Sequence, residues 1–150
     1  MARARRQLTV VYSCSGSSNV AQLANYLAVR LDRAGLAEMS CIAGVGGDVK
    51  PLVRTATSGA SIVAIDGCSL RCCEKVLAAK GVNPVRLVRL HERGLRKVQH
   101  TDFSAEEREH VYRDVLAELG PTLLAENPDL APTIVWELEP ELPQAEEEAA

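Results

Sequence analysis

The chain has 150 residues, of which 47% are hydrophobic and 25% charged, with a formal net charge of -3. This length and composition suit one soluble globular domain with its own core. The slightly acidic balance and the aromatic content of 3% argue against a nucleic-acid binder, which needs a basic surface and rings for base stacking. No apolar stretch suits a signal peptide or a membrane span, so we expect a cytoplasmic protein with reduced thiols.

Strand and helix patterns alternate along most of the chain. Short apolar runs rich in β-branched residues predict four buried strands, at 7–13, 37–43, 61–65 and 84–90. Segments with helical spacing or helix-capping residues lie between them, at 20–34, 48–58 and 68–79. Ser104 and Glu107 form a capping-box pattern that opens a further helix, which we expect Pro121 to end.

The C-terminal part is less regular. Residues 133–138 (TIVWEL) suit either an edge strand or a docked segment. Residues 140–150 contain the glutamate run 146–148 and predict a disordered acidic tail. We therefore expect one domain over residues 1–139, followed by a tail over 140–150.

The alternation of strands and helices predicts an α/β fold of three layers, Rossmann-like, with helices on both faces of a mostly parallel sheet. Right-handed crossovers restrict the topology, and the order 2-1-3-4 is the simplest for four such strands. In open sheets of this kind, ligands bind at the carboxyl ends of the strands.

All five cysteines fall where a predicted strand gives way to a loop or helix: Cys14, Cys41, Cys68, Cys72 and Cys73. In the order 2-1-3-4 the first three of these would follow three neighbouring strands. Cys72 lies four residues after Cys68, a spacing that places both thiols on one face of a helix. Cys73 is rotated by about 100° from Cys72 on such a helix and is expected to point elsewhere.

Four converging thiolates favour a metal site. Zinc accepts four cysteine ligands in tetrahedral geometry, so the leading hypothesis is a zinc-binding protein with Cys14, Cys41, Cys68 and Cys72 as ligands. Four thiolates also suit an iron–sulfur cluster, and the sequence leaves that choice open. Asp66, just before Cys68, is expected either to orient a ligand or to cap the following helix.

The sequence resembles the small DGC-domain family, whose namesake tripeptide is Asp66-Gly67-Cys68 here. The resemblance also covers Tyr12-Ser-Cys-Ser-Gly16 with Asn19, the segment Cys41-Ile-Ala-Gly44, and Cys72, and it spans about residues 8–119. It implies four zinc-chelating cysteines, which map to Cys14, Cys41, Cys68 and Cys72. The biochemical role of the family is undefined, and the resemblance does not account for Cys73 or for residues after Pro121.

A more distant resemblance points to an enzyme. The pattern Cys14-x-Gly16-x-Ser18 at a helix start is similar to the phosphate loop of low-molecular-weight phosphatases and arsenate reductases. Those enzymes place an arginine six residues after the cysteine, where this chain has Val20. Loss of that anion clamp argues against phosphatase chemistry. The alternative function is a thiol-dependent reductase acting on a small oxyanion or disulfide, in which Cys14 attacks and Cys68 or Cys72 resolves the intermediate.

Overall fold

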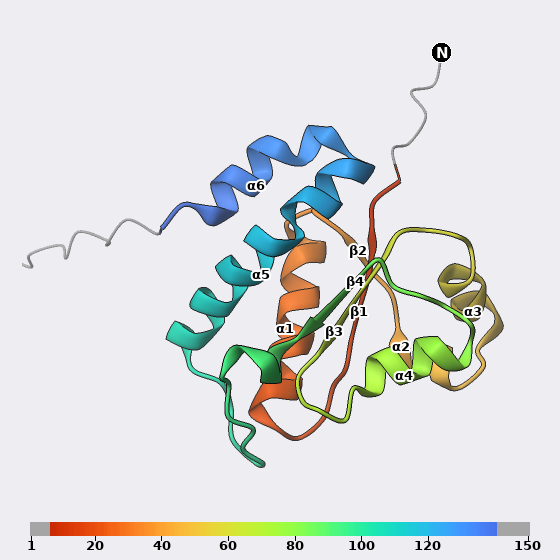
Figure 1. The fold of residues 1–150 in the computed structure, drawn as a ribbon, viewed down its shortest axis with the longest axis horizontal. Coiled ribbons are helices and arrows are strands. Elements are labelled where there is room, and N and C mark those ends of the chain that lie inside the picture. The colour runs from red at the N-terminus through yellow and green to blue at the C-terminus, as the bar shows by residue number, and fades with distance from the viewer. Residues whose placement is uncertain (1–6, 141–150) are drawn as a thin grey trace, which may run out of the picture.

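The computed structural model describes residues 7–140, and its sheet has the predicted topology (Figure 1). The four strands are all parallel, in the order β2-β1-β3-β4. Their bounds are β1 (Val10–Ser13), β2 (Glu38–Met39), β3 (Ile62–Asp66) and β4 (Arg86–Arg89). Every residue of the two central strands is buried, as expected for short apolar runs covered on both faces. The predicted α/β class and strand order are therefore confirmed.

Helices cover both faces of the sheet (Figure 1). One face carries α1 (Asn19–Arg33) and α5 (Ala105–Glu126), and the other carries α2 (Ile42–Gly46), α3 (Lys50–Ala56) and α4 (Cys72–Ala79). Two short 3-10 turns, η1 (Leu90–Arg93) and η2 (Pro128–Leu130), follow β4 and α5. The last helix, α6 (Ala131–Leu138), packs against α5. Among the helices described, none is long and apolar enough to cross a membrane.

The core lies between the sheet and these helices. The stripe of α1 that faces the sheet includes Leu23, Leu27 and Leu31, each at most 1% exposed. Ser18 caps α1 by accepting the N–H of Ala21 at 3.2 Å. These contacts place the first turn of α1 directly beside the carboxyl ends of the central strands.

The edge strand is shorter than predicted. We expected strand structure to residue 43, but β2 ends at Met39 and α2 begins at Ile42. A Cβ on Gly44 would lie 1.9 Å from Leu52 Cδ1. The small residues of this segment therefore allow α2 to pack closely against α3. β2 pairs with β1 only, so this packing is favoured over a longer edge strand.

The prediction that Pro121 ends its helix was wrong. The capping box of Ser104 and Glu107 is present, but α5 continues to Glu126 with Pro121 inside it. Proline removes one helical hydrogen bond, yet Leu119 and Leu123 on either side of it are both buried. Continuous packing of this stripe outweighs the lost bond.

The region after α5 is helical. Residues 133–138 belong to α6, so the docked segment is a helix and no edge strand forms there. The predicted tail, apart from Pro140, lies outside the described residues, as do residues 1–6 of the predicted domain.

Gly67 marks the closest approach between the end of β3 and α1. A Cβ at this position would lie 2.4 Å from the carbonyl oxygen of Val20 and 2.8 Å from the backbone nitrogen of Ala21. Backbone atoms cannot rotate away as side chains do, so any larger residue would have to move α1 or the turn. Gly120 offers a contrast, because a Cβ placed there has no heavy atom within 4 Å.

We expect Gly67→Ala to lower the free energy of unfolding by about 3 kcal/mol, the upper part of the range for overpacking. Gly120→Ala, in the middle of α5, should raise it by about 1 kcal/mol, because alanine is the better helix former. Urea unfolding followed by circular dichroism measures both changes. Equal stability of Gly67→Ala and the parent chain would contradict the close approach.

Candidate functional site

Three of the five thiols line one small cavity at the carboxyl edge of the sheet. Cys14, Cys68 and Cys72 surround a cavity of about 160 Å³, between the ends of β1 and β3 and the starts of α1 and α4. The basic side chains of Arg71 and Lys97 line the same cavity. The structure therefore brings together thiols that are up to 58 residues apart in the sequence.

Cys14 is the buried thiol of this cavity. It follows β1, and its Sγ accepts the backbone N–H of Gly67 at 3.2 Å. Burial raises the pKa of the Cys14 thiol to about 11, and the Gly67 N–H opposes that shift. Negative charge on Asp66, Cys68 or Cys72 raises the pKa further. At neutral pH the side chain is therefore a neutral thiol unless a cation lies beside it.

Cys68 and Cys72 reach the cavity from different elements. We predicted a helix from residue 68 that carries both thiols, and this was wrong, because α4 begins at Cys72. Cys68 lies in the preceding turn, which is closed by the Arg71 N–H donating to the Cys68 carbonyl at 3.1 Å. Arg71 has a left-handed backbone, with φ of 51°, which interrupts helical structure between the two cysteines. Cys68 is half-buried and Cys72 exposed.

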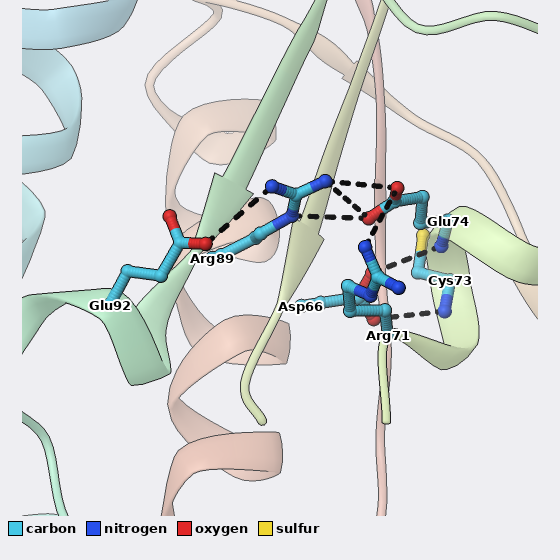
Figure 2. A network of polar contacts seen from close by, with 6 residues as sticks. All are labelled: Asp66, Arg71, Cys73, Glu74, Arg89 and Glu92. Atoms are coloured by element: carbon cyan, nitrogen blue, oxygen red, sulfur yellow. Dashed lines mark hydrogen bonds and ion pairs between the residues drawn. The ribbon is translucent and has the colours of Figure 1, made fainter. Parts of the chain in front are cut away.

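Asp66 determines where α4 begins (Figure 2). Its buried carboxylate accepts the backbone N–H groups of Cys73 at 2.9 Å and Glu74 at 3.0 Å. Burial raises the pKa of Asp66, and these two N–H bonds oppose the shift. Of the two roles we considered, the capping role is therefore present. Because the carboxylate already offsets the positive end of α4, that helix supplies less compensation for thiolates than α1 does.

A second layer of charge supports this helix start (Figure 2). The Arg89 guanidinium, at the end of β4, donates to both Glu74 oxygens at 3.0 and 3.2 Å. Arg71 lies 3.7 Å from Glu74 Oε1. The Arg89 hydrogen bond is the main cause of a lowered pKa of Glu74. The network ties three elements, β3, α4 and β4, together beside the thiol cavity.

Cys41 does not line this cavity. It is exposed and precedes α2. It lies two residues beyond the end of β2, whose last pairing with β1 is Val11↔Met39. The chain turns into α2 directly after Cys41, and its thiol is not among the groups that line the cavity. Cys73 is also outside the cavity, 1% exposed in the core.

The three cavity thiols do not form a ready-made metal centre. Within residues 7–140, no three side chains of histidine, cysteine, aspartate or glutamate are arranged so that they could hold a metal ion. The thiols share a cavity, but their sulfur atoms are not gathered around one point in this arrangement. Coordination by all three would require a rearrangement of these side chains or of the segments that carry them.

Sequence reasoning missed a strap that crosses the start of α1, which we define as residues 96–99. Asn19 fixes it with three hydrogen bonds: its backbone N–H donates to the Val98 carbonyl at 3.0 Å, its Nδ2 to the Arg96 carbonyl at 3.0 Å, and its Oδ1 accepts the Val98 N–H at 2.7 Å. The strap brings Lys97 Nζ to 3.5 Å from Cys68 Sγ. No spacing signal connects residue 97 with residue 68. The available clue was Asn19, which the family resemblance includes beside the motif at Tyr12 to Gly16.

The raised pKa of Cys14 predicts a loss of stability at high pH. The folded chain keeps a proton to about pH 11 that the unfolded chain releases above its ordinary value of 9.0. Stability is therefore full below pH 9 and falls as the pH rises toward 11. At pH 10.5, Cys14 should account for about 2 kcal/mol of that loss, at about 1.4 kcal/mol per pH unit.

Urea unfolding with EDTA at pH 8 and pH 10.5 tests this. The fall in unfolding free energy between the two pH values should be about 2 kcal/mol smaller for Cys14→Ser than for the parent chain, because serine does not titrate in this range. Cys41→Ser, at an exposed thiol, should show the full fall. If the Cys14→Ser variant loses as much stability as the parent, Cys14 is not the protonated buried thiol described here.

Comparison with known proteins identifies a family and a relative. A family model, the DGC domain, matches residues 10–115. A protein of Pseudomonas aeruginosa, the anaerobic and virulence modulator AnvM, is 54% identical over 114 residues, which cover 76% of this chain and 87% of that protein. No solved structure matches the chain. The matched region contains all five cysteines and the strap, and the chain belongs to the DGC-domain family.

Proposed function

We propose that this chain is a zinc-binding protein in which the thiolates of Cys14, Cys68 and Cys72 are the main ligands. The observation that supports the proposal is the shared cavity, which has a volume of about 160 Å³. Its three thiols come from the end of β1, the turn after β3 and the start of α4. Thiolate sulfur is a preferred zinc ligand. Cysteine is often buried simply as a small apolar residue. That role does not require three thiols to line one cavity at the carboxyl edge of the sheet.

The charges around the cavity support the same proposal. The Cys14 thiol keeps its proton at neutral pH because it is buried, and zinc binding supplies the positive charge that displaces such a proton. Three thiolates with one divalent cation carry a net charge of -1. Lys97, which donates to Cys68 Sγ, and the N-terminal end of α1 would offset that charge.

Zinc binding in this form needs a rearrangement, and we propose that the turn 68–71 moves. Zinc–sulfur bonds are about 2.3 Å long, and the described residues contain no group already arranged for them. The turn is suited to such a shift, because Leu70 at its tip is 58% exposed. Just before the turn, Gly67 donates its N–H to Cys14 Sγ. Just after the turn, the N–H of Cys73 in α4 donates to the Asp66 carboxylate.

Cys41 is the remaining candidate for a fourth ligand. It is exposed and does not line the cavity, so it has the weakest structural support of the four predicted ligands. We therefore expect it to contribute least to zinc affinity. A three-thiolate site with an open fourth position resembles exchangeable or catalytic zinc sites more than closed structural ones.

The thiol-reductase alternative with Cys14 as the attacking group has less support. The nucleophile in such reactions is the thiolate. Cys14 is 9% exposed, and burial raises its pKa to about 11. In the described arrangement it is both hard to reach and protonated at neutral pH.

Competition with a chromophoric chelator tests the zinc site in the metal-free full-length chain. Replacement of Cys14, Cys68 or Cys72 by serine should each lower zinc affinity by more than about 100-fold, because loss of a direct ligand exceeds the cost of losing its supporting contacts. Cys41→Ser is the matched control and should change affinity by less than about 3-fold. Cobalt(II) bound in place of zinc should show thiolate charge-transfer absorption that weakens in Cys68→Ser.

The outcomes separate the possible ligand sets. Zinc affinity that none of the three cavity variants changes would reject the proposal. An equal loss in Cys41→Ser would show that the start of α2 moves and that all four cysteines bind the metal. Strong visible absorption of chain purified without oxygen would indicate an iron–sulfur cluster instead.

A further inference from the structure

Cys68 differs from the other thiols of the described chain in its surroundings. It is half-buried at the cavity, and Lys97 Nζ donates to its Sγ at 3.5 Å. None of the other four thiols in the described chain has a hydrogen-bonded cation. Cys14 and Cys73 are buried, and Cys41 and Cys72 are exposed. Cys68 alone among them combines access from solvent with a positive charge at bonding distance.

The strap fixes that charge in place. Asn19 is 9% exposed, and it uses its backbone N–H and both side-chain polar atoms to bind the strap on either side of Lys97. Gln99 pairs with Ser18 in an isolated antiparallel bridge, and its side chain accepts the Ser17 hydroxyl. An exposed lysine that would otherwise sample many positions is thus carried to one thiol by a buried latch.

The other charges of the cavity leave it open to anions. Arg71 adds a second cation to its lining. The carboxylate of Asp66 also lines it, but that group is buried and accepts two backbone N–H bonds. Glu74, a half-buried acid of the neighbouring network, is paired with Arg89. An anion that approaches Cys68 therefore meets Lys97 and Arg71 before it meets an unpaired negative charge.

We propose that Cys68 is the reactive thiol of this protein, and that Lys97 directs small anionic disulfides to it. The Cys68 sulfur, its proton released to solvent, forms a bond to one sulfur of the disulfide. The disulfide S–S bond breaks, and the second sulfur leaves as a thiolate with the electron pair. The product is a mixed disulfide at Cys68, formed without any other oxidant. This inference does not depend on zinc binding, since it concerns the metal-free chain.

The test uses the full-length chain with EDTA on a Cys41→Ser/Cys72→Ser background, in which Cys68 is the one described thiol that is not buried. Its rates are measured with 5,5′-dithiobis(2-nitrobenzoate), which bears two carboxylates, and with the neutral 4,4′-dithiodipyridine. A substitution that changes the reactivity of the Cys68 thiol itself alters both rates alike, so it cancels in their ratio. Peptide mass mapping of the parent chain with limiting reagent identifies the cysteine that reacts first.

We expect Cys68 to be modified first in the parent chain. Lys97→Met should lower the anionic-to-neutral rate ratio by about 5-fold, the effect of one unit charge at about 4 Å in water. Lys97→Arg should keep most of the ratio, and added salt should reduce the ratio of the parent. Arg96→Met is the matched control, because it removes one positive charge from the same strap outside the cavity, and it should leave the ratio nearly unchanged.

Asn19→Ala gives a second, independent variant. It removes the two side-chain hydrogen bonds of the latch but keeps Lys97, so the rate ratio should fall toward that of Lys97→Met while circular dichroism shows a folded chain. The proposal is overturned if Lys97→Met keeps the parental ratio, if Arg96→Met lowers it as much, or if Cys41 or Cys72 of the parent chain reacts before Cys68. A failed zinc titration with these rate results intact would reject the zinc proposal alone.

Discussion

The contact between Gly67, Cys14 and α1 is the constraint on which the site depends. The Gly67 N–H donates to Cys14 Sγ, and the missing Cβ lets the turn lie against the Val20 carbonyl. One residue thus joins β1, β3 and α1 at the carboxyl edge of the sheet. Cys68 follows immediately in the chain, so the same contact sets where the next thiol begins.

Asp66 acts on the other side of this glycine. A buried carboxylate is costly unless it is hydrogen-bonded, and here the N–H groups of Cys73 and Glu74 supply those bonds. These two hydrogen bonds fix the start of α4 at Cys72, so residues 67–71 form a turn. In the tripeptide Asp66-Gly67-Cys68, the acid ends the strand and caps the helix, the glycine permits close packing, and the cysteine faces the cavity.

The sequence was sufficient for the fold because its signals were local. The apolar runs of β1 and β3 and the capping box of Ser104 and Glu107 each specify an element without reference to the rest of the chain. The errors arose where tertiary packing decides. Gly44 against Leu52 turned a predicted strand end into α2, and buried leucines carried α5 through Pro121.

The site was predictable in its elements but not in its detail. Strand order placed Cys14 and the cysteines after β3 at one edge, and the structure brings Cys14, Cys68 and Cys72 to one cavity. Cys41 lies outside that cavity, in a segment where β2 ends at Met39 and α2 begins at Ile42, and the sequence did not reveal this early end of the strand. Lys97 reaches the cavity because the strap is bound to the start of α1, where Asn19 contacts Arg96, 77 residues away in the sequence. Nothing in the spacing of charged residues indicates such a latch.

The two proposed chemistries compete for Cys68 and share Lys97. A thiolate bound to zinc has its electron pair engaged with the metal, so zinc at this site would protect Cys68 from disulfides. Conversely, a mixed disulfide at Cys68 removes one of the ligands that zinc would require. Lys97 suits both states, because it offsets the excess negative charge of a zinc thiolate site and attracts anions to the free thiol. A cavity built this way would couple metal occupancy to thiol reactivity through a single sulfur atom, with the latch at Asn19 holding the cation that both states use.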